Sequence, residues 1–161
     1  MIAFLFSNNA FASEQELMQK SYLTIYSVIE FMETGKGIEK ACSTAEDKFY
    51  AFTNWENSNA DALKNMLNIK KSYETKAIQK VGKNAKNAFE KHKNTIMAKV
   101  NKTLAPFNNN PKNKIIGACN NWAAAMSNKN SSFRSRIDNE ISFFIVERDN
   151  IYAAINNNAN W

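Results

Sequence analysis

The chain has a single histidine, His92, so a nucleophilic catalytic set of the Ser/His/Asp or Cys/His kind would have to use it. His92 lies at helical spacing between Phe89 and Ile96, on the apolar side of a long amphipathic segment. This position predicts a neutral imidazole packed in the core with one hydrogen-bond partner. The alternative is an axial haem ligand, because helical bundles can hold haem between a His and a Met and the chain has six Met. No haem-attachment motif supports that alternative.

The carboxylates show no spacing that indicates a metal or catalytic site. Glu46 with Asp47, and Glu147 with Asp149, are close pairs that point in different directions on a helix. Metal-binding bundles instead use carboxylate and histidine residues three positions apart, and no Glu-x-x-His occurs here. We therefore expect no metal, no cofactor and no catalytic residues, and we predict that the protein is not an enzyme. An enzyme that uses carboxylates alone stays open as an alternative.

The two cysteines, Cys42 and Cys119, have none of the spacings of a zinc, redox or haem-attachment motif. Each falls on the apolar stripe of its own helical segment, as a bond between two packed helices requires. The sequence therefore predicts one disulfide, Cys42 to Cys119, and such bonds are typical of exported proteins. Two buried free thiols would also lie on these stripes and are the alternative.

The lysines are the one large electrostatic feature. The net charge is +6, but residues 61–102 alone hold eleven Lys against three acidic residues. On a helical wheel most of these lysines lie opposite the apolar stripe, including Lys64, Lys71, Lys83, Lys86 and Lys93. The face is either simply solvated or it binds an anionic partner. Nucleic acid is disfavoured for an exported protein, and the aromatic residues of this segment, Tyr73 and Phe89, belong to its apolar stripe and not to the lysine face. An acidic protein partner fits best, and peripheral contact with an anionic membrane stays open.

The first residues resemble the end of a secretion signal. Ala10-Phe11-Ala12 has the small residues that a signal peptidase needs, and an apolar run at residues 2–6 precedes it. We predict that residues 1–12 are the remnant of a cleaved signal, that the mature chain begins at Ser13, and that the protein is periplasmic or secreted. The alternative is that residues 2–6 form an apolar arm on the domain. No window has the roughly 20 apolar residues of a membrane-spanning helix.

The elements that must position these residues are helical. Four Gly and two Pro are few for a sheet protein, and the apolar residues recur at helical spacing. We predict five helical segments: residues 13–34, capped by Ser13 and ended by Thr34-Gly35-Lys36-Gly37, then 38–56, 61–102 with a possible kink at Gly82, 115–126 and 133–155. Pro106 and Pro111 bracket a loop.

The expected architecture is all-α: an up-and-down helical bundle of four or five helices, stapled by the Cys42–Cys119 bond between the second and fourth segments. Residues 13–161 form a single domain with a short Asn-rich tail at 156–161. Trp55 and Trp122 lie on inward stripes and belong to the core, whereas Trp161 ends the polar tail and is exposed.

The absence of catalytic chemistry and the asymmetric charge together predict a binding function. We expect an exported, non-enzymatic protein of the inhibitor or immunity type, which occludes or holds an acidic protein partner while its lysine-rich face steers association. Two alternatives come from other classes. One is a carrier of haem or another small ligand, and the other is a membrane-active protein that uses the apolar first helix, residues 17–32.

Overall fold

The computed structural model describes the backbone of residues 5–43 and 49–158, and the side chains of 14–43 and 49–158. Within these residues the chain forms seven α-helices and no strand. The helices are α1 (Leu5–Cys42), α2 (Ala51–Ser58), α3 (Ala60–Val81), α4 (Lys83–Asn108), α5 (Lys112–Ser127), α6 (Ser132–Val146) and α7 (Arg148–Asn157). The predicted all-α class is therefore confirmed, with more helices than the four or five expected.

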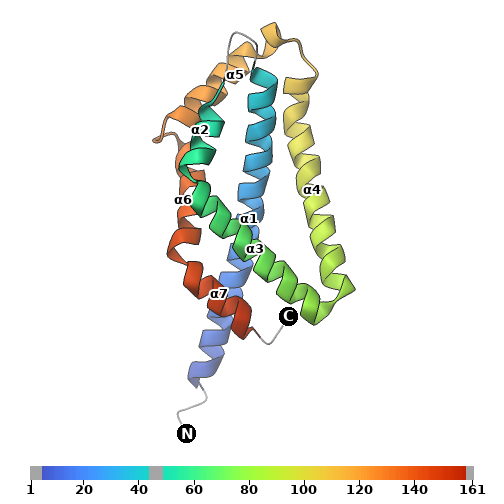
Figure 1. Cartoon of the computed structure of the whole chain (residues 1–161), viewed down its shortest axis with the longest axis vertical. Coiled ribbons are helices and arrows are strands. Elements are labelled where there is room, and N and C mark those ends of the chain that lie inside the picture. The colour runs from blue at the N-terminus through green and yellow to red at the C-terminus, as the bar shows by residue number, and fades with distance from the viewer. Residues whose placement is uncertain (1–4, 44–48, 159–161) are drawn as a thin grey trace.

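The long helix α1 is the axis of the molecule and packs against each of the other six described helices. Figure 1 shows α4 alongside it on one side and α2, α6 and α7 on the other, while α3 crosses it obliquely. Helix α5 covers the end where α1 finishes. The residues that the membrane-active alternative would use are part of this packing, because Met18, Ile25, Val28 and Phe31 of α1 are buried in the core.

Aromatic rings fill the centre of the core. The Phe31 ring lies 4.8 Å from the ring of Trp55 and 5.4 Å from that of Phe133, measured between centroids. Trp55 is 1% exposed and Trp122 is half-buried against the same cluster, so both belong to the core as predicted. Trp161 lies outside the described residues.

The predicted end of the first helix at Thr34 is wrong, since α1 continues through Gly35 and Gly37 to Cys42. Both glycines instead allow close packing. A β-carbon at position 35 would overlap the Phe52 ring, and one at position 37 would overlap the Leu104 side chain. The predicted start at Ser13 is also wrong, because α1 begins at Leu5. Whether residues 1–12 are a signal remnant stays a prediction.

The predicted helix 38–56 is not one element. Residues 38–42 are the last turn of α1, and α2 begins at Ala51. The bond between Cys42 and Cys119 is present, with an Sγ–Sγ distance of 2.03 Å and a Cα–Cα distance of 5.7 Å. The predicted pairing is confirmed, but the bond joins the end of α1 to α5.

The predicted helix 61–102 is two helices, and the chain reverses direction between them (Figure 1). Gly82 makes the reversal with φ of 71° and ψ of −139°, a conformation that glycine adopts without the steric penalty of a side chain. The expected kink is thus a turn, and α3 and α4 form a hairpin.

The last two predicted segments also differ from the structure. Residues 115–126 lie in α5, whereas 133–155 divides into α6 and α7 at Glu147. Pro106 lies inside the last turn of α4, so the loop between the prolines is shorter than expected. Pro106 has no backbone N–H to donate, so this turn has one helical hydrogen bond fewer.

Helix α2 is held by a side chain from another helix. The buried Glu39 carboxylate of α1 accepts hydrogen bonds from the backbone N–H groups of Phe52, at 3.1 Å, and Thr53, at 3.0 Å. The Thr53 hydroxyl donates to the same carboxylate. These are first-turn N–H groups of α2, which have no partner within their own helix. Glu39 therefore caps α2, whose own N-cap residue makes no side-chain bond.

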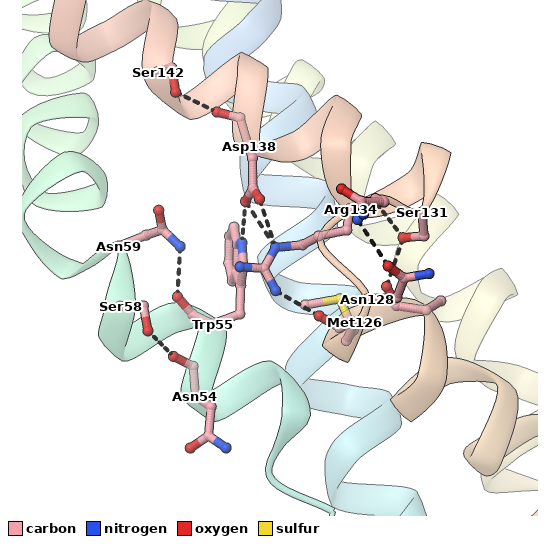
Figure 2. A network of polar contacts seen from close by, with 12 residues as sticks. Asn54, Trp55, Ser58, Asn59, Met126, Asn128, Ser131, Arg134, Asp138 and Ser142 are labelled. Atoms are coloured by element: carbon pink, nitrogen blue, oxygen red, sulfur yellow. Dashed lines mark hydrogen bonds and ion pairs between the residues drawn. The ribbon is translucent and has the colours of Figure 1, made fainter.

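A second polar network ties α2, α5 and α6 together (Figure 2). The Arg134 guanidinium, which is 8% exposed, donates from Nε to both carboxylate oxygens of Asp138 and from Nη1 to the Met126 carbonyl at 2.6 Å. Asp138 also accepts from Trp55 Nε1 at 2.9 Å. The Ser131 hydroxyl caps α6 by accepting from the Arg134 backbone N–H at 3.1 Å.

Candidate functional site

The α3–α4 hairpin and α1 enclose a groove of about 700 Å³. Helices α3 and α4 diverge from the turn at Gly82, and α1 passes between them as the floor (Figure 1). The volume is in the range of sites that bind small ligands or a short segment of a partner.

Apolar side chains from all three helices line this groove. They are Ile29 and Met32 of α1, Leu67 and Ile78 of α3, and Phe89, Ile96 and Met97 of α4. Leu67 is 44% exposed and Ile78 is 39% exposed, so neither belongs to the buried apolar stripe of α3. Part of the apolar surface of α3 is therefore left open to solvent at the groove.

Charged side chains border the apolar floor. Lys70 forms an ion pair with Glu74 at 2.7 Å, and Lys36 forms one with Glu56 at 2.9 Å. The Tyr26 hydroxyl also donates to Glu74 at 2.8 Å. The charges on the α3 side of the groove are therefore already satisfied within the protein.

The α4 side differs. Lys86, Glu90 and Lys93 line the groove and are exposed. None of the three has an ion pair within the described part of the chain, and the same holds for Glu33 on the floor. These side chains are the charges that the groove offers to a partner.

A cluster of rings lies beside the groove, and two of its members, Tyr26 and Phe89, line it. The His92 ring packs 4.3 Å from the Tyr26 ring and 5.4 Å from the Tyr22 ring, with Tyr73 and Phe89 beside them. His92 packs against these rings, but it is half-buried, so the predicted core position is wrong. Burial raises the pKa of the Tyr22, Tyr26 and Tyr73 phenols, and the neighbouring Glu74 carboxylate raises the pKa of Tyr26 further.

The five lysines predicted to bind a partner are all exposed, but they do not form one continuous face. Lys86 and Lys93 line the groove. Lys83 precedes Lys86 by three residues at the start of α4. On α3, Lys64 and Lys71 lie three and four residues from Leu67 and so flank it on the helix surface. The side chain of Lys71 also borders a shallow depression beside Ile155.

Comparison of the chain with protein-family models, with curated proteins and with solved structures gave no match in any of the three.

The groove presents apolar side chains on its floor and charged side chains at its edge. Within the residues that the structure describes, no three His, Cys, Asp or Glu side chains come together as metal ligands. In the same part of the chain, no helix has the length and apolar content needed to cross a membrane. The groove combines apolar contact area with charges at its edge, a pattern typical of surfaces that hold an amphipathic partner.

Sequence reasoning missed the groove because it forms between helices that are distant along the chain. The one available signal was Ile78, an apolar residue that lies off the buried stripe of its helix. Met32 and Met97 gave no signal, since they fit a core position equally well.

Proposed function

We propose that the protein is a non-enzymatic binding protein that holds an acidic protein partner in the groove between α1, α3 and α4. The observation that carries this proposal is the coincidence at one site of exposed apolar side chains, Leu67 and Ile78, with Lys86 and Lys93, which form no ion pair among the described residues.

The two kinds of side chain have different roles. The lysine excess of residues 61–102 attracts an acidic partner and raises the association rate, mostly at low salt. The apolar floor then supplies the affinity by removing Leu67, Ile78 and their neighbours from water. Binding in the groove covers the surface of the partner, so the protein acts in the manner of an inhibitor or immunity protein.

Export remains part of the proposal. The Cys42–Cys119 bond supports it, because disulfides persist in oxidising compartments such as the periplasm or outside the cell. The small residues Ala10 and Ala12 support a mature chain that begins at Ser13.

The test is affinity capture from an extract of the native source, with mass spectrometry of what is retained at low and moderate salt. We expect one stoichiometric acidic protein. The double variant Leu67→Lys with Ile78→Lys should lose it, whereas Val146→Lys, a change at a 76% exposed position of α6 outside the groove, should keep it. Equal capture by all three proteins would reject the groove as the binding surface.

A carrier of a small anionic amphiphile is the second candidate function. The groove volume of about 700 Å³ and its apolar lining favour it, because such sites usually measure 300–1,000 Å³. Retention of a small molecule by the purified native protein, released by Leu67→Lys, would support this function over protein binding.

A further inference from the structure

We propose that the occupant of the groove is one amphipathic helix of about three turns, carrying charges in the order acidic, basic, acidic along the side that faces α4. This inference rests on the proposed function and specifies which segment of a partner the groove accepts.

The shape of the groove favours a helix. Its walls run from Leu67 to Ile78 on α3 and from Lys86 to Met97 on α4. At 1.5 Å per residue each wall is about 16 Å long, which matches three helical turns. Helices α1, α3 and α4 all contact one another, so a helix laid between the two walls would pack against side chains of all three.

The chemistry of the walls disfavours a β-strand as the occupant. A strand needs hydrogen-bond partners for its backbone, whereas the groove is lined by side chains of helices whose own backbone groups are already bonded. A helix satisfies its backbone groups internally and presents only its side chains. It can therefore bury an apolar face against Ile29 and Leu67 without leaving polar backbone atoms unpaired.

The charges on α4 set the register of that helix. Lys86, Glu90 and Lys93 are spaced by four and three residues, so they lie on one face of α4 and alternate in sign. A helix beside them is matched when it carries acidic, basic and acidic residues at the same spacing. The α3 wall adds little preference for charged residues in the occupant, because its Lys70 is already paired with Glu74. The two carboxylates facing Lys86 and Lys93 agree with an acidic partner.

Glu33 is a further charged residue of the groove, on its α1 side. It is unpaired within the described residues and lines the groove from α1. Besides that of Glu90, it adds a second negative charge to the lining of the groove, which a basic residue of the occupant can offset. An occupant with acidic residues only would leave both carboxylates facing like charges.

The test uses two designed helical peptides. One has the order Glu, Lys, Glu at the spacing of the α4 residues, and the other has the order Lys, Glu, Lys. A compensating Lys in the first and Glu in the second, placed on the opposite face of the helix, make the two compositions equal. Fluorescence anisotropy should show the matched peptide binding about tenfold more tightly at low salt, since each matched charge pair at the rim adds a small attraction and each mismatch adds a repulsion of similar size. In the triple variant Lys86→Glu, Glu90→Lys, Lys93→Glu the preference should invert. Because all three positions are exposed, the variant should keep its circular dichroism spectrum and its Tm.

Three results would overturn the inference: no binding of either peptide, equal affinity for both, or displacement of a bound peptide by a fluorescent fatty acid at stoichiometric concentration. The control variant Lys91→Glu, at an exposed α4 position outside the groove lining, should leave the preference unchanged. If a partner protein is captured through the groove but cross-links from Lys86 and Lys93 reach an extended segment of it, the inference fails while the proposed function stands.

Discussion

Two buried charged side chains hold neighbouring helices together in this small protein. Glu39 and Arg134 are both buried, and each is surrounded by hydrogen-bond partners that compensate for its loss of water. The bonds of Glu39 cap α2, and those of Arg134 join α5 to α6. Neither role follows from the periodicity of the sequence, because a charged residue in an amphipathic helix is expected to face solvent.

Replacing Glu39 should show the strength of this cap. In Glu39→Gln one side-chain oxygen can still accept a hydrogen bond, but the amide NH₂ group faces the second backbone donor of α2. We expect the free energy of unfolding to fall by about 1–3 kcal/mol. Urea denaturation measures the change. Glu16→Gln, at an exposed position of α1, is the control and should unfold at the midpoint of the original protein.

The tyrosines around His92 predict a loss of stability at high pH. Their phenols have pKa values raised above the usual 10.0 in the folded protein, chiefly by burial, so the native state favours the neutral form. This contribution is fully present below the unfolded pKa and declines as the pH rises above about 10, where only the unfolded phenols ionise.

The change can be followed with matched variants. Denaturation midpoints should fall above pH 10 in the original protein and fall less steeply in Tyr22→Phe with Tyr73→Phe, which removes two of the three raised groups. Tyr50→Phe, at a 51% exposed position, should retain the original slope. An identical pH slope in all three proteins would contradict the assignment.

At the scale of helices, the glycines have structural roles that differ from those predicted from the sequence. Gly35 and Gly37 look like a helix stop, yet α1 continues through them because Phe52 and Leu104 pack against their bare backbone. Gly82 looks like a tolerated defect in a long helix, yet it forms the turn that separates α3 from α4. Local propensity describes each glycine alone, and the difference arises from which side chain approaches it.

Two alanine substitutions separate these effects. Gly35→Ala should destabilise the protein by about 1–3 kcal/mol, because the added methyl group overlaps the Phe52 ring, even though alanine has the higher helix propensity. Gly117→Ala, in α5 with open space around the added atom, should stabilise it by up to about 1 kcal/mol. Thermal unfolding of both variants tests the pair, and a rise in Tm for Gly35→Ala would contradict close packing at that glycine.

At the scale of the whole molecule, the central helix α1 takes part in both the disulfide bond and the groove. The end of α1 is bonded through Cys42 to α5, across 77 residues of sequence, while the middle of α1 forms the floor of the groove. The bond and the groove are on different parts of α1, so the protein can be stabilised at one end while the other site stays open to a partner.

Loss of the disulfide should therefore lower stability without changing the groove. In the chain-entropy model a loop of this length contributes about 4 kcal/mol. The double variant Cys42→Ala with Cys119→Ala should lower the urea midpoint accordingly, and peptide binding to the folded fraction should keep its affinity. A midpoint equal to that of the oxidised protein would show that the bond contributes nothing to folding.

The sequence by itself determined the helical class, the inward stripes and the pairing of Cys42 with Cys119, because burial of an apolar side chain repeats with the local period of a helix. It also located the lysine excess, since charge is additive along the chain. Only the tertiary structure decided where the helices end and which lysines meet exposed apolar side chains. The reversal at Gly82 brings α4 back along α1, and this step places Lys86 and Lys93 across the groove from Leu67 and Ile78. Such a juxtaposition depends on contacts between distant segments, which a local period does not encode.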